Sequence, residues 1–202
     1  MEEKRFDTTR RKEAQKKEDN LFLSYLHDFA FLIAGVLLIF SFLFRVVVVS
    51  GPSMNATLVD GDWLILVGNV LYTEPEPGDI IVASKDAFEN GAPIIKRVIA
   101  TEGQTVNIDF SAGVVYVDDV ALTEEYTLCP TYLYEGVDFP VTVEDGCVFV
   151  LGDNRGDSKD SRSPEIGQID KREILGKAVF LVVPGNNGGR TQRSFDRIGV
   201  LN

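Results

Sequence analysis

Ser53 is the first residue in this chain whose type and setting suggest chemistry. It follows four consecutive valines, residues 46–49, and a Gly51-Pro52 pair. Valine is β-branched and stiff about χ1, so this run favours an extended strand, and Gly51 and Pro52 then bend the chain. A small hydroxyl is therefore presented at an exposed bend after a long apolar run. Taken alone, such a serine is an ordinary loop residue, and its role depends on the rest of the chain.

The composition limits which base could activate this serine. The chain has one histidine, His27, which precedes the apolar run, whereas Ser53 follows it. A Ser-His-Asp triad needs an imidazole beside the hydroxyl and does not fit this arrangement. One histidine and two cysteines also fall short of the ligands of a zinc site, so we expect no metal. A nucleophilic Ser53 would then rely on Lys, Asp or Glu as its base.

Lys96 is the candidate base because it lies in an apolar, strand-like run, residues 94–100. Side chains alternate along a strand, so either Lys96 or Arg97 points the same way as a row of apolar neighbours. Burial lowers the pKa of a lysine, whereas an arginine keeps its charge. A neutral lysine amine can accept the proton of a serine hydroxyl from about 2.6–3.2 Å. The alternative is a solvent-facing lysine on an edge strand.

Residues 152–162 form the densest polar stretch and directly follow an apolar strand-like run, residues 147–151. An EF-hand calcium loop starting at Asp153 would need Gly at its sixth position and Glu at its twelfth, where this chain has Ser158 and Pro164. A merely solvated loop is the other alternative. Against it, the Ser158 hydroxyl could hold a lysine amine. Four charged side chains could brace the loop, namely Asp153, Arg155, Asp160 and Arg162.

The apolar run is the element that must place Ser53. We expect a polar tail over residues 1–20, a membrane anchor helix over 21–49 and an extracytoplasmic body over 50–202. Residues 29–49 would span roughly 31 Å as a helix, which matches a bilayer core, and Arg45 could extend its head group to the interface. Five basic residues lie between Arg10 and Lys17, which predicts a cytoplasmic N-terminus and a body outside the membrane. The alternative is a cleaved signal peptide, but the polar segment is long and no clean Ala-x-Ala site follows.

The body is expected to be mainly β, an antiparallel sandwich or partly closed barrel. Short β-branched runs separated by Gly, Pro, Asn and Asp predict strands at residues 63–67, 80–83, 94–100, 105–109, 113–117, 147–151 and 178–183.

Cys129 and Cys147 could form a disulfide on the outer side of a membrane or remain two partly buried thiols. The net charge is −11, of which the first twenty residues carry +1, so the body is acidic. An acidic body argues against nucleic-acid binding.

Three stretches in this order resemble the conserved boxes of bacterial type I signal peptidases, membrane-anchored Ser-Lys serine proteases. Gly51-x-Ser53-Met54 with Thr57-Leu58 is similar to the nucleophile box, and residues 96–100 with Gly103 are similar to the base box. Residues 152–162 match the last box at every fixed position, and the likeness covers roughly residues 20–185. Three boxes in order after one apolar span are a far more specific signal than one serine.

The resemblance implies that Ser53 is the nucleophile and that Lys96 is the general base and later the acid for the leaving amine. It implies that Ser158 orients Lys96, and that Asp160 and Arg162 shape the site from behind. The fold would be of signal-peptidase type, with one N-terminal transmembrane helix. No cofactor is implied, and the partners would be secretory preproteins and the lipid bilayer.

The resemblance also predicts how a substrate would be held. The oxyanion hole should include the Ser53 backbone N–H, and since Gly51 lacks the hydroxyl that some members carry there, a backbone group must replace it. An extended peptide with small residues at −1 and −3 would lie against residues 48–51 by strand addition. Val49, Gly51 and Met54 are therefore the expected substrate contacts.

Two residues depart from the family pattern, and two functions other than signal peptide cleavage are left open. Ala56 stands where the family usually has proline, and Gln104 stands where it usually has an acid. One rival is a self-cleaving Ser-Lys protease of the repressor type, which should carry a DNA-binding region. The other is a membrane-anchored binding module without catalysis, which the joint presence of Ser53, Lys96 and Ser158 argues against.

Overall fold

The structure is a computed structural model of the 202-residue chain, and it describes residues 2–85, 88, 91–186 and 194–201. Its regular elements are one long helix, twelve strands and two short 3-10 helices within these residues. In chain order they are α1 Glu2–Leu43, β1 Phe44–Val48, β2 Trp63–Gly68, β3 Ile80–Ser84, β4 Pro93–Thr101, β5 Thr105–Asp109, β6 Val114–Val117, β7 Val120–Ala121, β8 Val141–Thr142, β9 Cys147–Leu151, β10 Ile169–Asp170, η2 Lys171–Glu173, β11 Ile174–Val183, η3 Phe195–Arg197 and β12 Gly199–Val200.

The chain divides into a helical unit, Met1–Phe42, and a β unit, Leu43–Asn202. Helix α1 contains an apolar stretch, Leu23–Leu43, which has 21 residues, a mean hydropathy of 2.2 and no buried part. By length and composition this stretch is able to cross a membrane. The backbone of the expected polar tail is helical from Glu2 onward.

The prediction that residues 21–49 form one helix is wrong at its C-terminal end. Helix α1 ends at Leu43, and β1 pairs antiparallel with β2, with Val46 opposite Ile65 and Val48 opposite Trp63. The physical reason is the run of β-branched valines, which pack well on a pleated surface and lose χ1 freedom in a helix. The β unit therefore begins before residue 50.

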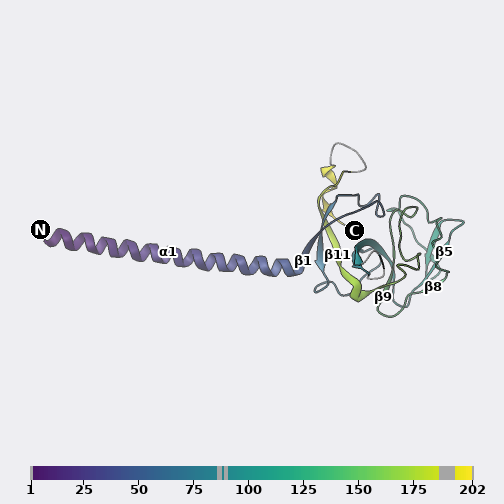
Figure 1. The fold of residues 1–202 in the computed structure, drawn as a ribbon, viewed down its shortest axis with the longest axis horizontal. Helices are drawn as coiled ribbons and strands as arrows, with labels where there is room; N and C mark the ends of the chain where they lie inside the picture. Colours follow the sequence, from purple (N-terminus) through teal and green to yellow (C-terminus); the bar gives the residue numbers. More distant parts are fainter. Residues whose placement is uncertain (1, 86–87, 89–90, 187–193, 202) are drawn as a thin grey trace. The chain divides into compact units, whose positions relative to one another are not determined.

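The β unit consists of two antiparallel sheets. The larger sheet has the order β1-β2-β11-β3-β4-β9-β10, with β12 added beside β11, and the smaller has the order β7-β6-β5-β8. Figure 1 labels β1, β9 and β11 of the larger sheet and β5 and β8 of the smaller. In the described chain β1 and β10 remain the two ends of the larger sheet, so it does not close into a barrel. The seven strands predicted from sequence are all present, and the mainly β fold is confirmed.

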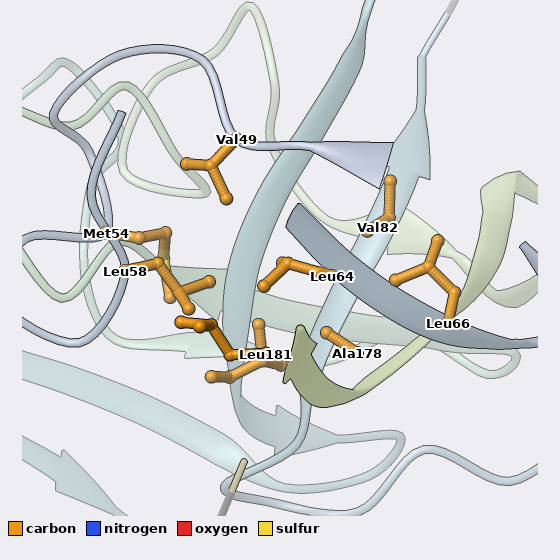
Figure 2. Close-up of a cluster of buried hydrophobic side chains, with 9 residues drawn as sticks. Val49, Met54, Leu58, Leu64, Leu66, Val82, Ala178 and Leu181 are labelled. Atoms are coloured by element: carbon orange, nitrogen blue, oxygen red, sulfur yellow. The ribbon is translucent and has the colours of Figure 1, made fainter. Parts of the chain in front are cut away.

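Three clusters of buried apolar side chains form the core of the β unit. The first is built around β2, β3 and β11, and it also takes in Val49, Met54 and Leu58 from the segment after β1 (Figure 2). The second joins the smaller sheet to β4 and β9, and the third covers the other parts of β3, β4 and β9. Strand β4 contributes to more than one cluster, so its residues 96–100 are buried on both faces.

Candidate active site

Ser53 lies on a closed loop, residues 49–62, which we call the nucleophile loop. Its two ends are tied together, because the Val49 amide donates to the Asp62 carbonyl at 2.8 Å and the Gly61 amide donates to the Val49 carbonyl at 2.9 Å. Met54 and Leu58 are fully buried, and their side chains point into the first core cluster (Figure 2). These contacts fix the residues on both sides of Ser53 to the sheet.

The Lys96 amine meets the Ser53 hydroxyl. Lys96 Nζ lies 2.8 Å from Ser53 Oγ, although the two residues are 43 positions apart in the sequence. This distance falls within the range needed for proton transfer between a hydroxyl and a base. The geometry also argues against a solvent-facing Lys96, since the residue is only 4% exposed.

Burial sets the protonation of Lys96. Loss of solvation lowers its pKa to about 8, against the opposing effects of the Asp160 and Glu135 carboxylates. The positive charge of Arg162 lowers the pKa further, and Asp153 raises it. About a tenth of the amine is therefore uncharged at pH 7 and about half at pH 8, compared with well under a thousandth at pH 7 for an ordinary lysine, and this uncharged fraction can accept a proton.

Arg97 is buried as well, although strand alternation predicted that only one of the two neighbours would point among apolar side chains. It is 2% exposed and forms a two-pronged ion pair with Asp153, at 2.9 Å from Nε to Oδ1 and 2.8 Å from Nη2 to Oδ2. Its guanidinium also donates to the Gly78 carbonyl and lies over the ring of Tyr126. The two neighbouring charged residues of β4 are therefore both buried, Lys96 against the Ser53 hydroxyl and Arg97 against the Asp153 carboxylate.

Asp153 connects the nucleophile loop to strand β4, which carries Lys96. Its Oδ2 accepts hydrogen bonds from Arg97 on β4 and from the Thr57 hydroxyl, the latter at 2.5 Å. Thr57 is four residues after Ser53, and Arg97 follows Lys96 directly. One fully buried carboxylate thus fixes the spacing between the segment that carries Ser53 and the strand that carries Lys96.

Ser158, Asp160 and Arg162 form a buried group behind Lys96. The Ser158 hydroxyl donates to Asp160 Oδ2 at 2.8 Å, and Arg162 donates to both Asp160 oxygens at 2.8 Å. The Gly152 amide donates to the same Asp160 oxygen as Ser158. A direct hydrogen bond between Ser158 and Lys96 is not found among the described residues, so the orienting role of Ser158 remains a prediction.

Gly152 and Asn154 belong to the site, and the sequence reasoning did not assign them a role. A Cβ on Gly152 would lie 2.1 Å from Ser158 Oγ and 2.5 Å from the Ser53 carbonyl oxygen. The Asn154 amide donates to that carbonyl at 3.0 Å, and its side chain donates to the Pro52 carbonyl. The signal available in the sequence was their position, directly after the buried strand β9 and before Ser158.

The Ser53 backbone amide is available as an oxyanion donor, since within the described chain it donates no hydrogen bond. The Gly51 amide, in contrast, donates to Asp60 Oδ1 at 2.9 Å. An amide at the nucleophile itself is well placed to stabilise charge that develops on an attacked carbonyl.

A cleft of about 570 Å³ opens over Ser53 and Lys96. Its walls come from β1 and the following Ser50, and from β3, β4 and Lys159. The full lining is Val47, Val48, Val49, Ser50, Ser53, Met54, Val82, Phe88, Ala92, Pro93, Ile94, Ile95, Lys96 and Lys159. Of the predicted substrate contacts, Val49 and Met54 line this cleft although both are buried in the core, while Gly51 is not among the described lining residues.

The remaining expectations concern residues away from this cleft. Cys129 and Cys147 are free, partly buried thiols. Ala56 is exposed on the nucleophile loop. The Gln104 side chain accepts from the Thr101 amide and donates to Asp118 Oδ2, so an amide here makes a contact that a second carboxylate could not.

The arrangement as a whole suits acyl transfer. It combines a hydroxyl, a buried amine of lowered pKa 2.8 Å away and a free backbone amide beside an apolar cleft. Groups of this kind supply a nucleophile, a general base and an oxyanion donor. A scaffold kept only for binding would have no need for a buried lysine held against a serine.

Comparison with known proteins identifies the family. Residues 22–183 match the family described as signal peptidase, peptidase S26. The chain is 34% identical to signal peptidase I of Bacillus licheniformis over 91% of its length and 99% of the relative. It is 39% identical to the probable signal peptidase I-1 of Synechocystis over 70% of its length and 72% of the relative.

A further relative is similar over almost its whole length. Signal peptidase I T of Bacillus subtilis is 33% identical over 91% of this chain and 97% of the relative. A crystal structure of a signal peptidase I from Enterococcus faecalis is 30% identical, covering 52% of this chain and 96% of that one with a TM-score of 0.41. The chain therefore belongs to the signal peptidase family, peptidase S26, and is a serine peptidase that cleaves signal peptides.

Proposed function

We propose that this peptidase removes signal peptides from secretory preproteins with Ser53 as nucleophile and Lys96 as general base. The observation that carries this assignment is the 2.8 Å contact between Lys96 Nζ and Ser53 Oγ, with the amine almost fully buried. A buried, uncharged amine is the state of lysine that can take a proton from an alcohol.

The reaction then proceeds in two acyl-transfer steps. Lys96 takes the Ser53 proton as Ser53 Oγ attacks the scissile carbonyl, and the Ser53 amide donates to the resulting oxyanion. The protonated Lys96 gives its proton to the leaving amine, which breaks the peptide bond and leaves an acyl group on Ser53. Lys96 next deprotonates a water molecule, and the resulting hydroxide attacks the acyl carbonyl. Protonated Lys96 then returns its proton to Ser53 Oγ as the bond from that oxygen to the acyl carbon breaks, which releases the signal peptide with a free carboxyl end.

The buried group behind the base supports this proton transfer. Because the Ser158 hydroxyl donates to Asp160, its lone pairs are free to accept a hydrogen bond from the Lys96 ammonium formed during the reaction. Arg162 holds both oxygens of Asp160 and so fixes the direction of that hydroxyl. In this proposal Ser158, Asp160 and Arg162 keep Lys96 aligned with Ser53 through each turnover.

The substrate lies extended in the cleft along residues 48–51. Strand β1 is the end strand of the larger sheet, so one of its edges can accept backbone hydrogen bonds from a peptide. Val49 and Met54 line the cleft, and they suit small side chains at the −1 and −3 positions. The apolar stretch Leu23–Leu43 anchors the chain in the membrane, with the N-terminus in the cytoplasm and the β unit outside.

The test is cleavage of a preprotein with an Ala-x-Ala site by the full-length protein in lipid vesicles. Wild-type protein should give one cut directly after the second alanine, identified by mass spectrometry. Ser53→Ala, Lys96→Ala and Lys96→Arg should abolish the cut and keep the native circular dichroism spectrum, because only the proton path is lost. Turnover by folded Ser53→Ala at the wild-type rate would show that another residue is the nucleophile.

A further inference from the structure

A fully buried carboxylate stands at the end of the nucleophile loop. Asp62 has no exposed surface, and its two oxygens accept hydrogen bonds from the Val59 amide at 2.8 Å and the Gly185 amide at 2.6 Å. An ionised group at such a site needs charge neutralisation in addition to hydrogen bonds. The partner comes from far along the chain.

Arg197 supplies this charge from the C-terminal segment, residues 194–201. Its Nη1 donates to Asp62 Oδ1 at 2.9 Å, and its Nη2 donates to Asp62 Oδ2 at 2.6 Å. A two-pronged pair of this kind fixes direction as well as distance. Arg197 is on η3 and lies beyond residues 22–183, which match the signal peptidase family.

Arg197 also contacts the nucleophile loop directly. Its Nη2 donates to the Thr57 carbonyl at 3.0 Å, across 140 positions of sequence. The Thr57 hydroxyl donates to Asp153, and Asp153 in turn pairs with Arg97 on β4. Thr57 is thus held at its backbone by Arg197 and at its side chain by Asp153, which pairs with Arg97 next to Lys96.

The C-terminal segment is itself fixed to the β unit. Strand β12 pairs with β11, the Leu201 amide donates to the Val179 carbonyl at 3.0 Å, and Leu201 packs against the core cluster that contains Met54 and Leu58. Gly185 lies so close to the loop that a Cβ there would be 2.1 Å from the Asp60 carbonyl oxygen. The loop is therefore enclosed by chain that follows the matched region.

We propose that Arg197 is a positioning residue that keeps Ser53 within reach of Lys96. The inference rests on the proposed function of Ser53 as the nucleophile. By holding Asp62 and Thr57 together, Arg197 closes the half of the loop that follows Ser53. A displacement of Ser53 Oγ by about 1 Å is enough to reduce proton transfer and attack by roughly a hundredfold.

A lysine cannot replace Arg197 in this role. The guanidinium reaches three oxygens on two residues at once, because its donors form a rigid fork, whereas an ammonium is a single point charge. Arg197→Lys therefore keeps the charge near Asp62 and loses the geometry. This makes it the variant that separates positioning of the loop from neutralisation of the buried carboxylate.

The experiment measures kcat and KM for preprotein cleavage by full-length Arg197→Lys and Arg197→Gln in vesicles. Both variants should lose roughly tenfold or more in kcat with KM changed less than about twofold, because the cleft is intact and the nucleophile is misplaced. Arg197→Ala should recover part of its kcat in millimolar guanidinium, which can refill the vacated position. The matched control is Arg172→Gln, which removes an exposed two-pronged pair with Asp170 and should leave kcat unchanged.

The outcomes separate the two proposals. An inactive Ser53→Ala together with wild-type kcat in Arg197→Lys would overturn the role of Arg197 and leave the proposed function in place. A loss of activity that only parallels a loss of folded protein, measured by thermal unfolding, with no rescue by guanidinium, would also overturn it. Wild-type turnover by Ser53→Ala would instead overturn the proposed function.

Discussion

The Lys96 amine is enclosed by β4 and its neighbours, and this burial lowers its pKa to about 8. Only the uncharged amine can accept the Ser53 proton, so activity should rise with pH until Lys96 is fully deprotonated. We predict that kcat/KM increases about tenfold per pH unit below pH 8 and levels off above it. The measurement is the pH profile of peptide cleavage between pH 6 and 10. A midpoint near 10.5, the ordinary pKa of lysine, would contradict the prediction.

Glu135 is a second carboxylate that acts on this amine. Its Oε2 is buried without a hydrogen-bond partner in the described residues, and it lies 3.8 Å from Arg162 Nε. The pKa of Lys96 is raised by Asp160, Glu135 and Asp153 and lowered by Arg162. Because a negative charge favours the ammonium, its removal should lower the pKa of Lys96.

Glu135→Gln should accordingly move the midpoint of the kcat/KM profile to lower pH, by a few tenths of a unit to about one unit. Glu74→Gln is the matched control, since it removes an exposed carboxylate that pairs with Lys171. That control should reproduce the wild-type midpoint. An unchanged or higher midpoint in Glu135→Gln would show that Glu135 does not act on Lys96.

At the scale of elements, the nucleophile loop and β4 are joined by the Asp153 carboxylate. Asp153→Asn would replace the carboxylate that pairs with the buried Arg97 guanidinium by a neutral amide and weaken the contact with Thr57. Loss of one member of a buried ion pair typically costs about 3–5 kcal/mol. We predict a loss of this size in the free energy of unfolding, measured with denaturant. Asp170→Asn, at an exposed pair with Arg172, should have little effect.

Gly152, directly after β9, packs closely against the Ser53 carbonyl of the nucleophile loop and the Ser158 side chain. Gly152→Ala should push Ser158 and the Ser53 carbonyl apart, because the added Cβ would overlap both. We predict a loss of kcat of roughly a hundredfold, measured with the preprotein assay. Gly156→Ala, whose Cβ would make only ordinary contact with Cys129, should retain activity. Equal activity in the two variants would show that this close approach is not required.

The strands could be predicted from sequence wherever they are long enough to show β-branched runs between turn residues. Strands β7, β8, β10 and β12 have two residues each and carry no such pattern. The end of the anchor helix could not be placed by hydropathy, because residues 44–49 are as apolar as the span before them. Their valines form a strand only because β2 is available to pair with them.

The site could be predicted only in part, because local sequence patterns identify candidate residues but not their distant partners. Ser53 and Lys96 stand in recognisable local settings, and their 2.8 Å contact lies within the expected range. Arg97 pairs with Asp153, 56 residues away, and Arg197 contacts Asp62 and the Thr57 carbonyl of the nucleophile loop across at least 135 positions. Local sequence patterns carry no information about partners this distant, so these contacts appear only in the folded chain.

At the scale of the whole molecule, the β unit Leu43–Asn202 contains the complete site and its own core. We predict that a fragment of residues 43–202 folds and cleaves a short soluble peptide at close to the full-length rate. Its cleavage of a preprotein in vesicles should fall by roughly tenfold or more, because enzyme and substrate no longer share one membrane surface. Equal vesicle cleavage by fragment and full-length protein would show that the anchor does not aid the encounter.

The use of a lysine in place of a histidine beside the serine also determines which inhibitors can react with this cleft. The chain has a single histidine, His27, which is on α1, and the described residues that line the cleft include no histidine. Affinity labels that alkylate the imidazole of a catalytic triad therefore find no target in this cleft. Such labels can be added to a crude membrane preparation to silence contaminating triad proteases while this enzyme continues to turn over.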